Sequence, residues 1–264
     1  MIPEERNGLA IRSLSWLSRC WVLASRFRTL SWAYQWADVF AAMAFESFGE
    51  RSRRFDWNHR RVWDFDNPVE HERYACVLSL ISSLRGPSCW GSALEVGCGS
   101  GVFTEILARP CSRVVAWEIA PEACAAARLR CRGLGNAEVE NLDILRNHPS
   151  GQYNLVFALD LLEVIHGRRR LARAVEKLID AVLPGGMFVM SGSRLPEPLK
   201  LSWCMWRFAE GADSHLLLLV NRPELELVRL NRFAPRGQTI PFYPEHLIAV
   251  FSKSCDEVSK FLER

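Results

Sequence analysis

Between residues 88 and 193 the hydrophobic positions fall into short runs that alternate with longer segments of helical spacing. Short apolar runs rich in β-branched residues predict strands, and apolar positions three and four residues apart predict helices. The predicted strands are Ala93–Val96, Val114–Glu118, Glu138–Asn141, Leu155–Leu159 and Met187–Ser191, and the predicted helices are Val102–Ala108, Pro121–Arg132 and Leu171–Val182. Strands that alternate with helices at this spacing indicate an α/β fold with a doubly wound, mostly parallel sheet.

Both flanks of this region add elements. Leu225–Phe233 and His246–Ser252 read as strands with no long helix between them, which predicts an antiparallel C-terminal edge pair. Upstream, Asp66-Asn67-Pro68 followed by Glu70 predicts the start of a helix that runs to about Leu84. We therefore expect one α/β domain over residues 70–264, with an insertion at about 195–220, after an N-terminal segment over residues 1–69.

The N-terminal segment has helical spacing and many aromatic residues. Apolar residues recur along two stretches, with Leu14, Leu17, Trp21 and Ala24 in the first and Trp32, Trp36 and Phe40 in the second. Two interpretations fit these helices. They form a layer over a substrate cleft or a dimer contact, or they lie on a membrane surface with arginines toward lipid phosphates.

The composition excludes several classes of protein. The net charge of +3 is too small for a nucleic-acid-binding stripe, and Arg168–Arg170 reads as a solvated loop or helix start. Nine cysteines without a C-x-x-C pair argue against a disulfide framework and a zinc site. No apolar run of membrane-spanning length occurs. We expect a cytoplasmic protein with neither a metal nor a nucleic-acid partner.

The most informative stretch is a glycine-rich turn between a predicted strand and a helix, Glu95-Val96-Gly97-Cys98-Gly99-Ser100-Gly101. Glycines let a ligand approach the backbone, and a helix N-terminus adds amide donors. The loop therefore suits a nucleotide-like cofactor. A dinucleotide fingerprint would place its third glycine at Val102. Glu95 would repel a pyrophosphate but attract an ammonium or a sulfonium, unless it is a structural acid that caps the turn.

Acidic residues also follow the next two predicted strands. Glu118, 21 residues after Gly97, is placed to accept hydrogen bonds from both hydroxyls of a ribose. Asp143 is placed to accept from an adenine amino group, or else to cap a helix. Because the carboxyl ends of parallel strands share one edge of a sheet, these groups predict a site for an adenosyl cofactor with a positive charge.

The motifs resemble those of class I S-adenosylmethionine-dependent methyltransferases. Leu94–Gly101 is similar to their first motif, Ala116–Ile119 to the second-strand motif, Tyr153–Ile165 to the fourth-strand pattern, and Leu183–Val189 to the turn into the fifth strand. This resemblance covers about residues 70–255. Within the superfamily, Asp66–Tyr74 resembles the NodS-like nodulation N-methyltransferases, a group that methylates an amine on a chitooligosaccharide.

The resemblance implies a Rossmann-like fold and metal-free methyl transfer from S-adenosyl-L-methionine to an N or O atom of a small-molecule, sugar or natural-product acceptor. Gly97, Gly99 and Gly101 would shape the loop, Glu95 would face the methionyl ammonium, and Arg73 and Tyr74 would cover the cofactor or bind its carboxylate. The predicted cofactor-binding residues are Arg73, Tyr74, Glu95, Gly97, Cys98, Gly99, Gly101, Glu118, Ile119, Asp143, Ile144, Leu159 and Asp160.

A general base is expected because the acceptor loses a proton. His166, just past the fourth strand, is the first candidate and His71 the second, with His215 and His246 behind them, although each also reads as a structural histidine. The insertion carries Trp203, Met205, Trp206 and Phe208, which suit an acceptor pocket or core packing. Two rivals remain at this point: an NAD-dependent oxidoreductase and a non-catalytic cofactor-binding scaffold or subunit.

Overall fold

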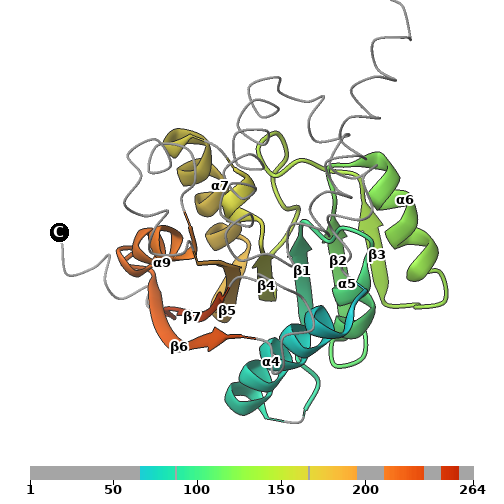
Figure 1. Cartoon of the computed structure of the whole chain (residues 1–264), viewed down its shortest axis with the longest axis horizontal. Coiled ribbons are helices and arrows are strands. Elements are labelled where there is room, and N and C mark those ends of the chain that lie inside the picture. Colours follow the sequence, from blue (N-terminus) through green and yellow to red (C-terminus); the bar gives the residue numbers. More distant parts are fainter. Residues whose placement is uncertain (1–65, 87, 166, 195–210, 235–244, 256–264) are drawn as a thin grey trace, which may run out of the picture. The chain divides into compact units, whose positions relative to one another are not determined.

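The computed structural model describes residues 66–86, 88–165, 167–194, 211–234 and 245–255 (Figure 1). In these ranges a seven-stranded sheet has the order β3-β2-β1-β4-β5-β7-β6. The strands are β1 (Ser92–Val96), β2 (Arg113–Trp117), β3 (Ala137–Glu140), β4 (Tyr153–Leu159), β5 (Val182–Ser193), β6 (Leu225–Phe233) and β7 (His246–Lys253). β1 to β5 are parallel, and β7 runs antiparallel to both β5 and β6. The predicted mostly parallel sheet with an antiparallel C-terminal pair is confirmed.

The helices of the described ranges are α4 (Pro68–Arg85), α5 (Val102–Leu107), α6 (Pro121–Arg130), α7 (Arg168–Asp180) and α9 (Ala212–Val220), with a short 3₁₀ turn, η1 (Leu162–Val164). The start of α4 follows from its sequence. The Asn67 side chain accepts hydrogen bonds from the amides of Val69 and Glu70 at 2.9 and 3.1 Å, and proline occupies the first helical position. The predicted helix before the sheet is therefore confirmed.

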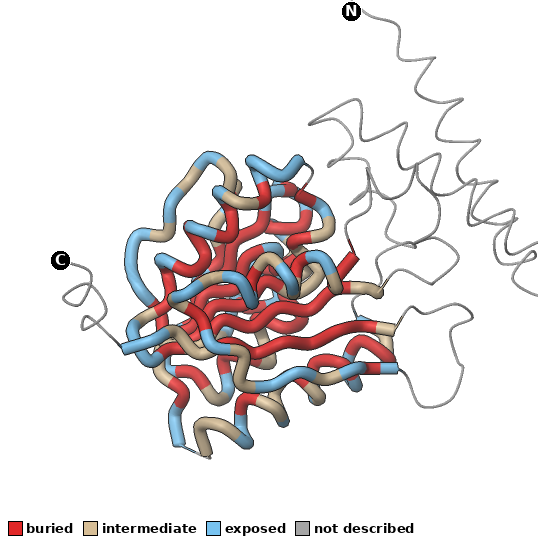
Figure 2. Tube along the Cα trace, turned by 90° about the vertical axis from the view of Figure 1, so that its left-hand side faces the viewer, coloured by how far each residue is buried: buried red, intermediate tan, exposed pale blue. Residues whose placement is uncertain are grey.

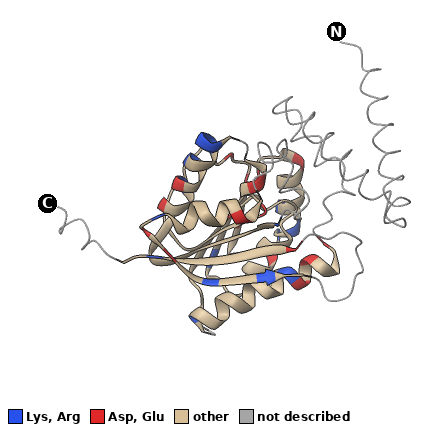
Figure 3. Cartoon of the chain, turned by 60° about the vertical axis from the view of Figure 1, so that its left-hand side comes forward, with Lys and Arg blue, Asp and Glu red and all other residues tan. Residues whose placement is uncertain are grey.

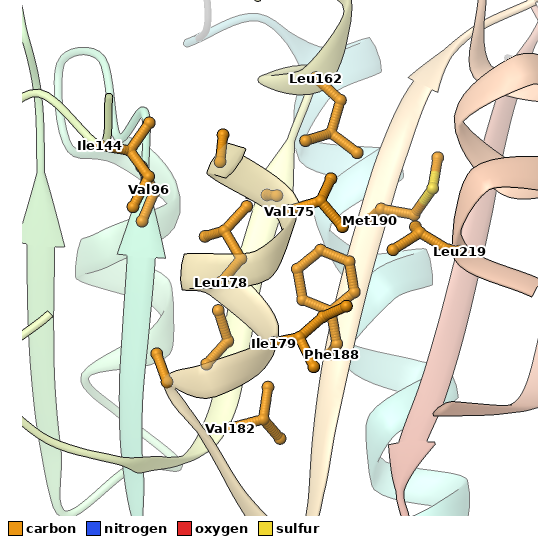
Figure 4. Packing of buried hydrophobic residues seen from close by; sticks show 14 of the residues in the cluster. Val96, Ile144, Leu162, Val175, Leu178, Ile179, Val182, Phe188, Met190 and Leu219 are labelled. Atoms are coloured by element: carbon orange, nitrogen blue, oxygen red, sulfur yellow. The ribbon is translucent and has the colours of Figure 1, made fainter. Parts of the chain in front are cut away.

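Alternating strand residues supply two hydrophobic layers, one on each face of the sheet. One layer joins α7 and α9 to the sheet, and Figure 4 shows Val175, Leu178 and Ile179 of α7 facing Phe188 of β5. The other layer joins α4 and α5 to residues such as Ala93 and Phe157, and α6 packs on the same face through Ala116. Figure 2 shows the inner strands buried along most of their length, whereas β6 is exposed or half-buried between its two buried ends.

Two elements differ from the predictions. β5 begins at Val182, where a helix was expected to end, because Val182 pairs with Tyr153 before an irregularity that contains Gly185 at φ +73°. The Pro-Gly-Gly turn signal therefore lies inside a distorted strand rather than before it. Helix α9 was not predicted. All five residues of its Leu216–Val220 run are apolar, so no helical period is visible in that part of the sequence.

Several predictions concern residues outside the described ranges. The N-terminal helices with their dimer or membrane contact, His166 and the aromatic residues at 203–208 lie there, whereas the predicted boundary at residue 69 falls inside α4 and stays a prediction. In the part of the chain that the structure describes, no helix is long and apolar enough to cross a membrane, and no group of three metal-ligating side chains occurs. Figure 3 shows acidic and basic residues interspersed on the helices rather than gathered in a basic stripe.

The strand register brings the loops after β1 to β5 to one edge of the sheet. Val96 pairs with Trp117, Trp117 with Glu140, and Leu159 with Ser191. The antiparallel strand β7 begins at the same edge, where His246 pairs with Ser193. Side chains that follow five strands and precede a sixth are thus gathered at one place.

Candidate functional site

The glycine-rich loop after β1 has a backbone that requires glycine. Gly97 and Gly101 have φ of +84° and +78°, in the left-handed region. A Cβ atom on Gly101 would lie 2.9 Å from the Cβ atom of Ala127 in α6. Gly101 is also the residue before the first turn of α5. The loop is therefore held close to α6, and the amides at the start of α5 lie at the carboxyl edge of the sheet.

Glu118, directly after β2, is bound to this loop. One carboxylate oxygen accepts a hydrogen bond from the Gly99 amide at 2.8 Å, and the other accepts from the Ala120 amide at 2.8 Å. Burial raises the pKa of Glu118, and these backbone hydrogen bonds oppose that shift. The structure thus brings the acid after β2 to the middle of the glycine loop, as the sequence predicted.

Asp143 lies beyond β3 in a compact turn. Its carboxylate accepts a hydrogen bond from the Leu145 amide at 2.9 Å. Asn141 links this segment to the end of β2, because its side-chain amide donates to the carbonyl oxygens of Glu118 and Ile119 at 2.7 and 3.1 Å. Asp143 and Glu118 therefore belong to adjoining segments at the same edge, on the β2–β3 side of the glycine loop.

Glu95 lies inside β1, and its carboxylate accepts a 2.6 Å hydrogen bond from the Thr104 hydroxyl of α5. Burial raises the pKa of Glu95 to about 7, with a smaller contribution from the charge of Glu118, and the Thr104 hydrogen bond opposes the shift. The acid therefore connects β1 to α5. Its contact with a methionyl ammonium remains a prediction.

A second polar group lies on the other side of the glycine loop, at the ends of β4 and β5. Asp160, which follows β4, has φ of +52° and accepts a 3.0 Å hydrogen bond from the Ser191 hydroxyl. The guanidinium of Arg73, reaching from α4, lies 2.9 Å from the Asp160 carboxylate and donates to Ser191 at 2.8 Å. Arg73 also binds Glu70 and is only 1% exposed. Arg73 thus joins α4 to two strands.

Glu163 and His246 extend this group. The Glu163 carboxylate accepts hydrogen bonds from the Ser193 amide at 3.0 Å and from the Ser193 hydroxyl at 2.9 Å. Burial and, to a smaller extent, the charge of Asp160 raise the pKa of Glu163 to about 7, and the Ser193 hydrogen bonds oppose the shift. His246 is buried, and its Nε2 atom lies 3.7 Å from Asp160.

The other predicted residues are spread over the core and the surface. Tyr74 is buried and packs on Phe103, with ring centroids 5.0 Å apart. Cys98 and Ile144 are buried, Leu159 is half-buried at the end of β4, and Ile119 is exposed.

His71 is exposed on α4 and bound to Asp66 at 2.8 Å. His215 is buried in α9, which lowers its pKa to about 4. Roles in binding or catalysis remain predictions for all of them.

The family model described as Nodulation protein S (NodS) matches residues 52–238, more than half of the chain. The chain belongs to the NodS family. The nodulation protein S of Rhizobium tropici is 28% identical to this chain over 178 residues, which are 67% of this chain and 70% of that protein.

An O-methyltransferase matches a shorter part of this NodS-family chain, and a solved methyltransferase structure matches a longer part. The ubiquinone biosynthesis O-methyltransferase of Xanthomonas axonopodis pv. citri is 29% identical over 54% of this chain and 60% of its own length. Among solved structures, the N-methyltransferase NodS from Bradyrhizobium japonicum WM9 in complex with S-adenosyl-L-homocysteine has a TM-score of 0.64 at 24% identity. It covers 77% of this chain and 97% of its own.

These matches confirm the predicted family, the Rossmann-like methyltransferase fold and S-adenosyl-L-methionine as the cofactor of a methyltransferase. The acceptor is not established by them.

The sequence did not single out four polar residues of the site: Asn141, Glu163, Ser191 and Ser193. A signal for the serines was present, because a polar residue at alternate positions near the end of an otherwise apolar strand marks one face at the carboxyl edge. Glu163 lies in the fourth-strand motif, but its pairing with Ser193, 30 residues away, is a tertiary contact.

Proposed function

We propose that this NodS-family methyltransferase transfers the methyl group to a nitrogen or oxygen atom of a small-molecule, sugar or natural-product acceptor. In this proposal the β2–β3 side of the glycine loop binds the adenosine, and the β4–β5 side receives the acceptor. The likeness to the N-methyltransferase NodS of Bradyrhizobium japonicum supports nitrogen, whereas the likeness to the ubiquinone biosynthesis O-methyltransferases supports oxygen. The proposal depends on one observation, the 2.8 Å hydrogen bond that holds Glu118 against Gly99 of the loop.

The residues present fit an adenosyl cofactor. Gly97 is exposed, and a Cβ atom on it would lie 3.2 Å from the Leu161 side chain, so a larger residue at this position would crowd Leu161. Glu118 and Asp143 are acceptors suited to ribose hydroxyls and an adenine amine. Among the predicted cofactor-binding residues, the acids outnumber the bases, which suits a cationic cofactor better than a dinucleotide phosphate.

The chain's own residues would bind and orient the cofactor and would exclude water from it. Glu118 would hold the ribose and Asp143 the adenine, with Ile119 and Ile144 beside the base. Leu159 and Asp160 would border the methionyl end of the cofactor. Glu95 would supply a negative charge toward the methionyl ammonium, and Cys98 would line the glycine loop. When bound, the cofactor supplies an activated methyl group, so the protein mainly contributes positioning. His166 and His71 stay as predicted bases.

Binding of S-adenosylhomocysteine, measured by calorimetry, tests this function. Wild-type protein should bind it, and Glu118→Gln should weaken binding roughly ten- to hundredfold, because a hydrogen bond to a charged group is worth about 1.5–3 kcal/mol. Glu138→Gln, which changes an exposed acid of the neighbouring strand, is the matched control and should bind as wild type. Equal affinity of the Glu118 variant and wild type would reject the assigned role, and binding of NAD instead would favour an oxidoreductase.

The acceptor can be tested with labelled cofactor and two probes. An oligomer of glucosamine and N-acetylglucosamine offers a free amine, and a catechol offers a hydroxyl. Methyl transfer to the first supports a nitrogen acceptor and transfer to the second an oxygen acceptor. If S-adenosylhomocysteine binds but wild-type protein methylates neither probe, the proposed acceptor class is too narrow.

A further inference from the structure

Polar side chains occur in two separate groups, one on each side of the glycine loop. Glu118 and Asp143 lie on the β2–β3 side and suit the adenosine. The group on the other side, which we call the β4–β5 cluster, consists of Arg73, Asp160, Glu163, Ser191, Ser193 and His246. Strand order places β1 and its loop between the two groups, so the cluster adjoins the opposite end of any ligand that spans the loop.

The segment that carries Asp160 and Glu163 lies directly against the loop. A Cβ atom on Gly97 would be 3.2 Å from Leu161 Cδ1, so these two parts of the chain touch at the first glycine. Leu161 is the residue after Asp160 and two before Glu163. The two carboxylates are therefore within a few residues of the contact between the fourth-strand segment and the cofactor loop.

The two carboxylates differ in their partners. Asp160 lies 2.9 Å from the buried guanidinium of Arg73, which neutralises it. Glu163 is held by the amide and hydroxyl of Ser193, and among the described residues no Lys, Arg or His forms an ion pair with it. It is only partly buried. Glu163 is thus a fixed carboxylate without a direct countercharge, which is the state expected of a proton acceptor.

We propose that Glu163 is a catalytic residue that accepts the proton of the methyl acceptor, with Ser193 and Arg73 as positioning residues. This inference rests on the proposed function. The acceptor's N or O atom forms its bond to the methyl carbon as the carbon–sulfur bond breaks, with that bond's electron pair remaining on sulfur. The proton of the acceptor passes to the Glu163 carboxylate and later to water.

The surrounding charges suit this task. Burial and the charge of Asp160, which follows β4, raise the pKa of Glu163, and the Ser193 hydrogen bonds and, to a smaller extent, the charge of Arg73 from α4 lower it, which leaves it at about 7. His246 of β7 lies 3.7 Å from Asp160. Directly after β5, Arg194 pairs with Asp213 and Glu245, which offset its charge. A base whose pKa lies near the working pH is efficient in both taking and releasing a proton.

Sinefungin provides a test that needs no acceptor. This cofactor analogue carries an amine-bearing carbon in place of the methylsulfonium, so its ammonium occupies the place of the transferred methyl group. The quantity measured is the ratio of the dissociation constants of S-adenosylhomocysteine and sinefungin at pH 8, in wild type and in Glu163→Gln. We expect this ratio to be roughly tenfold lower in Glu163→Gln than in wild type, because the variant lacks the negative charge that attracts the ammonium of sinefungin. The affinity for S-adenosylhomocysteine should stay within about threefold of the wild-type value.

Proton exchange supplies a readout that a purely structural role would not change. At pH 6.5 wild-type Glu163 is partly protonated, so sinefungin binding should release a fraction of a proton, which calorimetry in buffers of different ionisation enthalpy counts. Glu163→Gln should release less. Glu140→Gln is the matched control, because Glu140 is also an edge carboxylate with a single neutral partner, Trp117 Nε1 at 2.8 Å, but lies on the adenosine side.

The outcomes separate the two proposals. If wild-type protein binds neither ligand, the proposed function fails. If both ligands bind but the ratio and the proton count are the same in Glu163→Gln as in wild type, only the role of Glu163 is overturned. Loss of the preference in both Glu163→Gln and Glu140→Gln also overturns it, because the effect would then be a general loss of negative charge.

Discussion

Lys177 and Asn147 are joined by a 2.8 Å hydrogen bond from the ammonium group of the lysine to the main-chain carbonyl oxygen of the asparagine. The same ammonium group donates to the carbonyl oxygens of Ile144 and Leu145 at 2.8 and 3.1 Å. Lys177 is a buried residue of α7, and its three acceptors belong to the turn that begins with Asp143. One side chain therefore fixes the turn that we assign to the adenine.

Replacing Lys177 by Met should loosen this turn and weaken recognition of the adenine amino group. We expect Lys177→Met to bind S-adenosylhomocysteine about tenfold more weakly, which corresponds to about 1.4 kcal/mol. The variant's preference for S-adenosylhomocysteine over S-inosylhomocysteine should fall as well, because S-inosylhomocysteine has a carbonyl oxygen in place of the adenine amino group. Calorimetry with both ligands measures the two effects.

Lys253→Met is the matched control for that experiment. The Lys253 ammonium group also donates to two carbonyl oxygens, those of Ile179 and Val182, both at 2.8 Å, but these belong to the end of α7 and the start of β5 rather than to the Asp143 turn. Lys253→Met should lower the free energy of unfolding but keep the wild-type preference for S-adenosylhomocysteine over S-inosylhomocysteine. An equal loss of preference in both variants would show that Lys177 has no particular effect on the Asp143 turn.

Gly101→Ala should destabilise the fold. The substitution places a side chain on a residue with φ of +78° and a Cβ atom 2.9 Å from that of Ala127. The left-handed conformation alone costs about 1–2 kcal/mol for a residue with a Cβ atom, and the contact adds to this. Urea denaturation should show a lower free energy of unfolding by about 2 kcal/mol or more. Gly133→Ala, where nothing lies within 4 Å of the added atom, is the control and should change stability little.

Arg73→Met removes the buried cation of the β4–β5 cluster. Because Asp160 and Glu70 would then be left without it, we expect a loss of about 3–5 kcal/mol in the free energy of unfolding at pH 8. Adding Asp160→Asn should restore part of the loss. Arg113→Met breaks an exposed pair with Glu138 and should cost less than about 1 kcal/mol. Similar losses in the two single variants would contradict the buried role of Arg73.

His215 should make the fold sensitive to acid. Burial lowers its pKa from 6.5 to about 4, so the unfolded chain binds more protons than the folded one between these values. The contribution of His215 to stability is therefore complete above pH 6.5 and is lost as the pH falls to about 4, by up to about 3 kcal/mol. His215→Leu should show a flatter dependence of urea-unfolding free energy over this range. An unchanged slope would mean that His215 titrates normally.

Local sequence was sufficient for the glycine loop and Glu118. A strand, a turn and a helix follow one another in the sequence, and the acid after the next strand reaches the loop because neighbouring parallel strands end together. Periodicity also predicted β6 and the start of β7 at the residues where the structure has them.

The β4–β5 cluster was not predictable in this way. Arg73 was expected at the cofactor, a role that stays a prediction, and the structure shows its side chain in contact with Asp160, Ser191 and Glu70. Glu70 is a local partner, three residues away on α4, but the contacts with Asp160 and Ser191 depend on how α4 packs across the sheet, and no local spacing encodes them. The same holds for Lys177, whose three acceptors are backbone atoms and leave no trace in the residue types of the turn.

The position of β7 also determines when the sheet can be completed during synthesis of the chain. Residues 246–253 are inserted between β5 and β6, although both of those strands leave the ribosome earlier. A nascent polypeptide that has grown only to residue 245 therefore has a gap in its sheet, with the hydrogen-bonding edge of β5 uncovered. The Rossmann-like core can be completed only once the codons for residues 246–253 have been read, so closing the sheet follows translation of every other strand in it.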